Sequence, residues 1–217
     1  MRPDEVRARL SRLPKTPPQA GVLPHPPEWL RPVRTDGGAL PERPPVGTDT
    51  RAAAALVCLF PDAVGAVRVI LTERVDHGGH HSGEVSLPGG KAEPGELDPV
   101  ETALREAREE IGLDPAACGL ELLGFLEPTW IPASNFRVMP VVGLAARAPS
   151  LVADPREVFA IFDAPLEAFL PDAPRTNLER TIRGWPLRHG AYTVDGRVVW
   201  GATARILAQL GAVLAAR

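Results

Sequence analysis

Runs of apolar residues, and short stretches in which apolar and polar residues alternate, follow one another after residue 50 in a pattern typical of β-strands. The stretches AAAALVCLF (52–60) and VRVILTER (67–74) flank PDAVGA and predict a hairpin. Further strands are expected at residues 120–127, 137–146 and 157–162. A second hairpin is expected in YTVDGRVVW, because the pair Asp195-Gly196 accepts positive φ.

The clearest helical pattern covers residues 99–111, beginning at Pro99 and stopping at Gly112. At about 100° per residue, its apolar residues fall within an arc of roughly 100° and predict a buried stripe: Val100, Ala103, Leu104, Ala107 and Ile111. Further helices are expected at 4–13, 166–170 and 201–216. Strands and helices mix without regular βαβ alternation, so the predicted fold class is α+β, or an α/β/α sandwich with a mixed sheet between helices.

The first 50 residues have a different character, since they hold eleven of the 25 prolines. Each proline removes a backbone donor, which disfavours helices and central strands over residues 14–50. We predict an ordered, extended arm that lies on the body of the protein or on a partner. Its apolar anchors would be Leu23, Trp29, Leu30 and Val33. The predicted organisation is an arm (1–50) followed by one domain (51–217).

The composition changes this picture little. With 44% hydrophobic residues, 24% charged residues and a net charge of −3 over 217 residues, the chain is typical of a globular protein and gives no indication of binding to nucleic acid or membrane. The start of the sequence has no apolar signal region, and the apolar segment 202–216 carries Arg205 and is too short for a bilayer. We therefore expect a cytoplasmic protein with a small-molecule substrate. The oligomeric state is not predicted, and Cys58 is expected to be a buried thiol.

Three glutamates stand close together on the predicted helix. Glu109, Glu106 and Glu110 fall at about 180°, 240° and 280° from Val100, and like charges four residues apart cost about 0.2–0.5 kcal/mol. By the same geometry, Arg105 lies on the far side of the glutamates and relieves their repulsion only in part. Two interpretations follow: a solvated acidic face, or a site for a hard cation such as Mg²⁺, which takes oxygen ligands.

A resemblance decides between these interpretations. Residues 90–113, GKAEPGELDPVETALREAREEIGL, resemble the Nudix box, G-x5-E-x7-R-E-U-x-E-E-x-G-U with U apolar. The matching residues are Gly90, Glu96, Arg105, Glu106, Glu109, Glu110, Gly112 and Leu113. Two departures occur: eight residues separate Glu96 from Arg105, and the first U position holds Ala107. The resemblance implies a Nudix fold and hydrolysis of a nucleoside diphosphate linked to another group, with Mg²⁺ or Mn²⁺ as cofactor.

The resemblance also implies roles for individual residues. Glu106, Glu109 and Glu110 would ligate the metal together with Gly90, and the tightest ligation is expected from Glu106 and Glu110. Arg105 would orient the carboxylates. The general base stays open between Glu106, Glu109 and Glu157, because a base must lie within hydrogen-bond reach of the attacking water.

The segment before the box resembles a narrower group. Residues 70–90, ILTERVDHGGHHSGEVSLPGG, are similar to the signature of coenzyme A pyrophosphatases, L-L-T-x-R-[SA]-x3-R-x3-G-x3-F-P-G-G. The matching residues are Leu71, Thr72, Arg74, Gly83, Pro88, Gly89 and Gly90, and the departures are Val75, Gly79 (arginine in the signature) and Leu87. Segments 128–143, 154–170 and 199–207 also resemble that group. The resemblance implies cleavage of coenzyme A to 3′,5′-ADP and 4′-phosphopantetheine, with substrate contacts at Arg74, Gly83, Gly89 and Arg137.

Several alternatives remain open. The substrate could instead be ADP-ribose or another nucleoside diphosphate derivative, or the domain could be a catalytically silent ligand sensor. Arg74 and Arg137 would either bind a 3′-phosphate or form salt bridges.

Other side chains also have two interpretations. His77, His80, His81 and Glu84 form either a zinc site or, more in keeping with the absence of cysteine partners, a substrate-facing loop. Trp130 and Phe136 would stack on adenine or pack in the core. Trp200 is expected to be a core residue.

Overall fold

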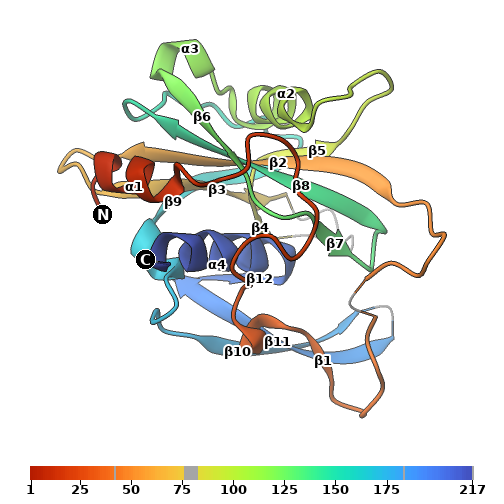
Figure 1. The fold of residues 1–217 in the computed structure, drawn as a ribbon. Helices are drawn as coiled ribbons and strands as arrows, with labels where there is room; N and C mark the ends of the chain where they lie inside the picture. The colour runs from red at the N-terminus through yellow and green to blue at the C-terminus, as the bar shows by residue number, and fades with distance from the viewer. Residues whose placement is uncertain (42, 76–82, 183, 217) are drawn as a thin grey trace.

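The protein, seen in a computed structural model, is described over residues 1–41, 43–75, 83–182 and 184–216. Within these residues an eight-stranded mixed sheet lies between helix α2 (Pro99–Ile111) on one face and helix α4 (Gly201–Ala215) on the other (Figure 1). A four-stranded sheet lies beyond α4. The predicted fold class, a mixed sheet between helices, is confirmed.

The large sheet is built around its longest strand, β2. Its strands are β2 (Arg51–Pro61), β3 (Val67–Arg74), β4 (Val85–Ser86), β5 (Gly89–Lys91), β6 (Leu120–Phe125), β7 (Thr129–Ile131), β8 (Phe136–Ala145) and β9 (Val158–Pro165). Strand β8 runs parallel to β2, from Arg51 opposite Phe136 to Leu59 opposite Leu144. Since β8 occupies one edge of β2, the antiparallel strands β3 and β5 share the other edge, β3 at its end and β5 at its beginning. The predicted hairpin of β2 and β3 is confirmed.

Strand β2 is apolar without interruption because both of its faces are buried. Leu56 and Cys58 point to the α2 side, and Val57 and Leu59 point to the α4 side. Cys58 is fully buried, as expected, and burial raises the pKa of its thiol to about 12.

Helix α2 begins and ends where the sequence predicts. The carboxylate of Asp98 accepts a hydrogen bond from the backbone N–H of Val100 at 2.9 Å, Pro99 occupies the first turn, and Gly112 ends the helix with a φ of 64°. Ala107 and Ile111 in the predicted stripe are fully buried. A single turn of helix, α3 (Pro115–Cys118), follows directly.

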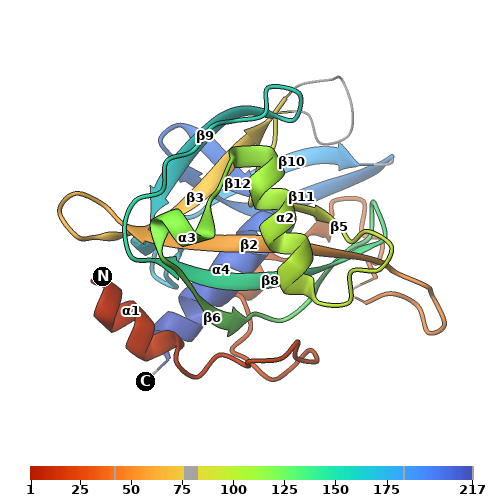
Figure 2. The same cartoon turned by 90° about the horizontal axis from the view of Figure 1, so that it is seen from above.

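The small sheet contains β1 (Val33–Arg34), β10 (Thr176–Ile182), β11 (Trp185–Val194) and β12 (Arg197–Trp200). The hairpin of β11 and β12 was expected, and its turn has positive φ at Asp195 (48°) and Gly196 (77°). Strand β10 and the first half of β11 were not expected. Gly190 of β11 allows Trp29 of the arm to pack directly on the strand. A Cβ at this position would lie 2.4 Å from Cε3 of Trp29. Figure 2 shows this sheet from above, beneath the large one.

The arm is ordered and contains α1 (Pro3–Leu10) and a 3₁₀ turn, η1 (Glu28–Leu30). Leu23 and Leu30 are buried, and Trp29 packs edge-on against Tyr192 with ring centroids 5.2 Å apart. The expectation that Val33 is an anchor is wrong, since its side chain is 42% exposed in β1.

Two buried polar side chains fix the arm to the body. Oε1 of Glu127, a residue that is 6% exposed, accepts hydrogen bonds from the backbone N–H groups of Val22 and Leu23, both at 2.6 Å. Gln209 in α4 accepts the backbone N–H of Glu127 at 3.0 Å and donates to the carbonyl of Pro24 at 3.4 Å. The arm is therefore bonded to the loop between β6 and β7 and to the last helix.

Replacing Glu127 with alanine is expected to release the arm. The change leaves buried backbone N–H groups without an acceptor, at a cost of about 1–3 kcal/mol. Thermal melting and the rate of tryptic cleavage within residues 14–50 would measure it. Glu101→Ala is the matched control, because Glu101 is an exposed carboxylate on α2, a helix outside the arm. Equal cleavage rates in both variants would contradict the anchoring role.

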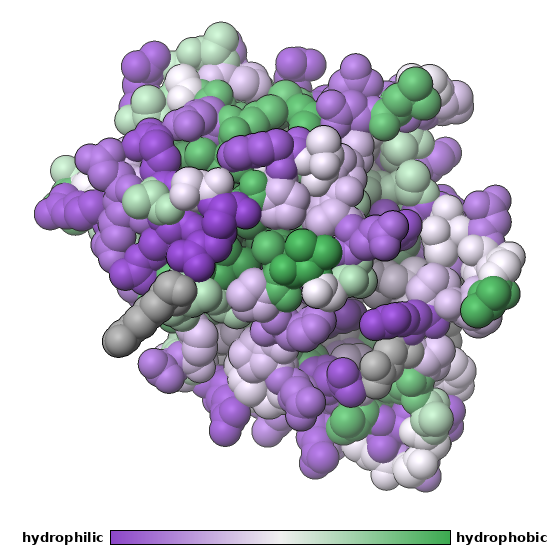
Figure 3. Space-filling view, viewed as in Figure 1, coloured by the Kyte–Doolittle hydropathy of each residue, from purple (hydrophilic) through white to green (hydrophobic). Residues whose placement is uncertain are grey.

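The remaining helical turn, η2 (Leu166–Phe169), is a 3₁₀ helix at the place where a short helix was expected. None of the helices in the described residues combines the length and apolar character needed to cross a bilayer. The face shown in Figure 3 is largely hydrophilic, and its hydrophobic residues lie in separate groups.

Candidate metal and pyrophosphate site

The three glutamates of α2 do not share one environment. Glu110 is 3% exposed, the side chain of Glu106 is 14% exposed, and that of Glu109 is 59% exposed. Glu106 and Glu110 therefore face the sheet, while Glu109 faces solvent. The predicted acidic face is divided into a buried pair and one outer carboxylate.

The two glycines of β5 receive the buried pair. The backbone N–H of Gly89 donates to Oε2 of Glu110 at 3.1 Å. A Cβ on Gly90 would lie 2.4 Å from Oε1 of Glu106, so a side chain at this position would occupy the space of the carboxylate. The glycines before the helix and the glutamates on it thus form one site, as their order in the sequence predicts.

Arg105 connects the outer and inner carboxylates. Its Nη1 donates to Glu106 at 3.0 Å and to Glu109 at 2.9 Å, and its Nε donates to Glu96 at 2.8 Å. Its Nη2 donates to the carbonyl of Lys91 at 3.0 Å. The expectation that Arg105 lies on the far side of the glutamates is wrong, because the helical angle describes Cβ directions and the long arginine side chain folds back along the helix.

Glu96 keeps its place despite the additional residue between it and Arg105. The hydrogen bond from Arg105, with help from the N–H of Glu93 and the hydroxyl of Thr102, lowers the pKa of Glu96 to about 2. The extra residue is therefore accommodated in the loop before α2. Sequence reasoning did not include Glu96 among the site residues, although its position in the box was a signal for it.

Burial dominates the electrostatics of the inner pair. It raises the pKa of Glu110 to about 7, and the N–H of Gly89 and the charge of Arg74 offset this effect only in part. Burial also raises the pKa of Glu106 against the opposing effect of Arg105. The nearby positive charges thus do not fully compensate for the burial of the two carboxylates in their ionised form.

Arg74 and Glu157 complete the group from the neighbouring strands. Nη1 of Arg74, at the end of β3, lies 3.5 Å from Oε1 of Glu110, and its Nη2 lies 4.0 Å from Oε2 of Glu157. Backbone hydrogen bonds also join these segments. The N–H of Val75 donates to the carbonyl of Glu157 at 3.0 Å, and the N–H of Asp154 donates to the carbonyl of Glu110 at 2.9 Å.

The other predicted substrate residues lie at different distances from this group. Gly83 has a φ of 67° and donates its N–H to the carbonyl of Arg74 at 3.2 Å, so it stands at the edge of the site. Arg137 lies on β8, opposite Ala52 of β2, so β2 stands between it and β3. His77, His80 and His81 fall outside the described residues.

Trp130 and Phe136 both make side-chain contacts within the protein. Nε1 of Trp130 donates to Oδ1 of Asn135 at 3.1 Å, and the guanidinium of Arg51 lies 4.0 Å from the centre of the Phe136 ring. These contacts favour the packing interpretation over adenine stacking.

The donor set fits a hard divalent cation, because Glu106, Glu109 and Glu110 supply carboxylate oxygens and Gly90 leaves room beside Glu106. In the described residues no group of three acidic, histidine or cysteine side chains is already arranged around a metal position. Arg105 is hydrogen-bonded to Glu109, and Arg74 lies against Glu110. A cation bound here would compete with these two arginines for the carboxylate oxygens.

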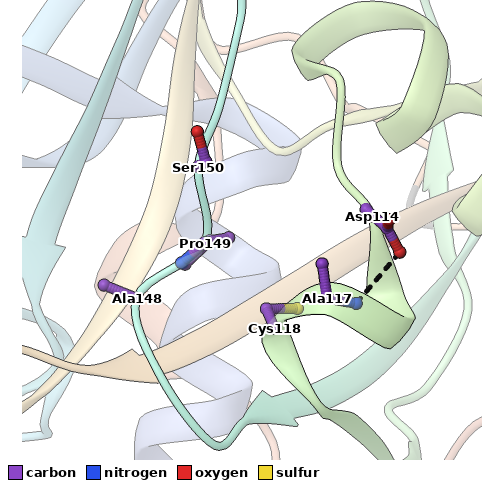
Figure 4. Close-up of a pocket in the computed structure, with 6 residues that line it drawn as sticks. All are labelled: Asp114, Ala117, Cys118, Ala148, Pro149 and Ser150. Atoms are coloured by element: carbon purple, nitrogen blue, oxygen red, sulfur yellow. Dashed lines mark hydrogen bonds between the residues drawn. The ribbon is translucent and has the colours of Figure 1, made fainter.

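A hollow elsewhere on the same half of the molecule has different chemistry. A cavity of about 230 Å³ lies between α3 and residues 148–150, and Cys118 is among its lining residues (Figure 4). Its carboxylate, Asp114, caps α3 by accepting the N–H of Ala117 at 3.0 Å. The cavity therefore offers no second acidic site.

Residues 50–183 match the NUDIX domain family. The chain belongs to the Nudix family. This Nudix chain is 43% identical over 178 residues to Nudix hydrolase 22, chloroplastic, of Arabidopsis thaliana, which is 78% of this chain and 57% of that protein. It is 43% identical over 167 residues to Nudix hydrolase 15, mitochondrial, of the same plant, which is 74% of this chain and 58% of that protein.

A bacterial relative covers more of its own length. The Nudix chain is 35% identical over 144 residues to the uncharacterized Nudix hydrolase NudL of Yersinia pestis (strain Pestoides F), which is 65% of this chain and 70% of that protein. By contrast, it spans less than two thirds of the length of the two plant relatives. Because those two are named for the chloroplast and the mitochondrion, a cytoplasmic location stays a prediction.

Proposed function

We propose that this protein hydrolyses the pyrophosphate bond of coenzyme A, giving 3′,5′-ADP and 4′-phosphopantetheine, with Mg²⁺ or Mn²⁺. The supporting observation is the contact between Arg74 and Glu110. Arg74 belongs to the segment that resembles the coenzyme A pyrophosphatase signature, and Glu110 belongs to the Nudix box. The two segments that imply the substrate and the chemistry thus meet at one buried carboxylate.

The main requirement of the proposed reaction is stabilisation of negative charge on the phosphate groups. A pyrophosphate concentrates negative charge, and its cleavage depends on positioning and charge stabilisation. Glu106, Glu109 and Glu110, beside Gly90, would hold the metal. When bound, the metal supplies neutralisation of the phosphate oxygens and a water of lowered pKa.

The chain's own residues position the substrate and the proton acceptor. The planar guanidinium of Arg74, beside Glu110, would suit two phosphate oxygens of the substrate. Arg105 holds Glu106 in place. For the general base we favour Glu157, whose carboxylate is exposed and lies beside Arg74 at the entrance to the buried pair; Glu106 and Glu109 are the alternatives.

Product analysis tests the proposal. The protein is incubated with coenzyme A and Mg²⁺, and the products are separated by chromatography. Release of 3′,5′-ADP and 4′-phosphopantetheine in equal amounts is expected, with no release in EDTA. If ADP-ribose or a dinucleotide is hydrolysed far faster than coenzyme A, the substrate proposal is wrong and the second candidate holds.

That second candidate, a Nudix hydrolase of ADP-ribose or another nucleoside diphosphate derivative, is favoured by one sequence feature. Gly79 stands where the coenzyme A signature has an arginine. Without the positive charge of that arginine, one expected contact to a highly anionic substrate is missing. The third alternative, a silent sensor, gives no reason to bury two carboxylates beside each other.

A further inference from the structure

The small sheet carries a polar group that the proposed reaction does not use. His189 on β11 is 5% exposed, and among the residues that the structure describes neither of its ring nitrogens has a hydrogen-bond partner. Buried polar groups are nearly always bonded, so an unbonded one calls for an explanation such as a ligand. His189 packs edge-on against Trp200 of β12, with ring centroids 4.9 Å apart.

An arginine lies on the same tryptophan. The guanidinium of Arg180, on β10, stands 4.9 Å from the centre of the Trp200 ring. Its side chain is 47% exposed, and its ion pair with Glu84 is long, at 3.8 Å. Arg180 is therefore close to His189 and still accessible to an anion.

The positive end of a long helix is at the same place. Trp200 is the N-cap residue of α4, and within the described part of the chain no side chain caps the N–H groups of the first turn, which have no partner inside the helix. The hydroxyl of Thr203 in that turn donates elsewhere, to the carbonyl of Val85 at 3.1 Å. Uncapped N–H groups and the helix dipole favour an anion at this end.

This group is linked to the metal site through Glu84. The backbone N–H of Arg74 donates to the carbonyl of Glu84 at 3.0 Å, and the guanidinium of Arg74 contacts Glu110. Figure 1 shows β12 directly below β4, the strand that follows Glu84. Glu84 therefore contacts both arginines, Arg74 through its main chain and Arg180 through its side chain.

We propose that Arg180, His189 and the first turn of α4 bind a phosphate monoester on the nucleoside part of the substrate, with Trp200 beside the base. This rests on the proposed function, and in coenzyme A the group is the 3′-phosphate. Arginine suits phosphate through its planar fork. Selectivity for a 3′-phosphorylated nucleotide then depends on Arg180 and Trp200. The sequence pointed instead to Arg74 or Arg137 for this phosphate and to a core position for Trp200.

The protonation state of His189 agrees with this role. Burial lowers the pKa of His189, the charge of Arg180 lowers it further, and Glu84 opposes them. The ring is therefore neutral at pH 7 and offers one N–H donor. A bound phosphate would act in the opposite direction and raise this pKa, which a proton NMR titration of His189 can record.

Dephospho-coenzyme A, which lacks only the 3′-phosphate, isolates the subsite. Arg180→Gln is expected to raise KM for coenzyme A about 10- to 100-fold, while kcat and the KM for dephospho-coenzyme A change less than twofold. His189→Phe keeps the contact with Trp200, removes the unbonded nitrogens, and is expected to raise KM for coenzyme A with an unchanged or higher Tm. Arg175→Gln is the matched control, because that guanidinium lies over Trp29 instead.

Calorimetry without metal provides a test that does not depend on turnover. The wild-type protein is expected to bind 3′,5′-ADP at least tenfold more tightly than 5′-AMP, and Arg180→Gln is expected to abolish the difference. Equal affinities in the wild type, or equal KM changes for both coenzymes, would overturn the subsite. If neither coenzyme is hydrolysed but the affinity difference is present, the proposed function fails and the phosphate subsite stands.

Discussion

Replacing Glu106 with glutamine is expected to lower kcat for coenzyme A by about 10²–10⁴-fold, the range for loss of a group that acts directly on the reacting centre. The amide has the shape of the carboxylate and can still accept the bond from Arg105, which is 3.0 Å long in the wild type. It cannot supply the negative charge that holds a divalent cation. Stopped assays of 3′,5′-ADP release with Mg²⁺ would measure the loss.

A matched variant separates this effect from a general change of charge on the helix. Glu101→Gln alters an exposed carboxylate in the first turn of α2 and is expected to keep kcat within twofold. The Tm of both variants should stay close to that of the wild type. Near-normal turnover by Glu106→Gln would place the chemistry in a different active site.

Replacing Glu110 with glutamine is expected to stabilise the metal-free protein at neutral pH while abolishing metal binding. The rise in the pKa of Glu110 from 4.5 to about 7 means that the folded state holds a proton there more tightly than the unfolded state. The wild type therefore loses stability as pH rises from about 4.5 to about 7. Because one pKa unit is worth about 1.4 kcal/mol, and glutamine gives up the contact with Arg74, the expected gain is about 1–3 kcal/mol.

Urea unfolding in EDTA at pH 5 and pH 8 would measure this difference. The two proteins should have similar free energies of unfolding at pH 5, and the variant should be the more stable at pH 8. Millimolar Mg²⁺ should then stabilise the wild type, since a ligand that binds the folded state raises its stability. A similar gain from Mg²⁺ in Glu110→Gln would show that Glu110 does not ligate the metal.

The sequence predicts those parts of the molecule that short-range signals determine. Asp98, Pro99 and Gly112 delimit α2 through capping and φ preferences that involve only neighbouring residues. The hairpin of β2 and β3 and the Asp195-Gly196 turn follow from equally local patterns. The residues that resemble the Nudix box fix the order of glycines and glutamates, and these meet in space as that order implies.

Long-range packing determines what the sequence does not predict. A helical wheel gives the direction of the Glu110 side chain but not how closely the sheet packs against it. The burial of Glu110 therefore could not be predicted from residue spacing. Strand β10 contains exposed polar residues and little alternation, so its sequence has no clear strand pattern. The close packing of Trp29 on Gly190 of β11 joins residues more than 140 positions apart, and short-range patterns cannot predict it. The association of Arg180, His189 and Trp200 depends on the pairing of β10 with β11, which the sequence pattern does not predict.

The anchoring of the arm by Glu127 and Gln209 has a consequence for biosynthesis. The backbone groups of Val22 and Pro24 leave the ribosome early, whereas Gln209 is translated near the end of the chain. At about 5–20 residues per second, this leaves the proline-rich segment undocked for roughly ten to forty seconds. During that interval the segment is accessible to proteases and chaperones. Its high proline content disfavours β-aggregation while it is undocked.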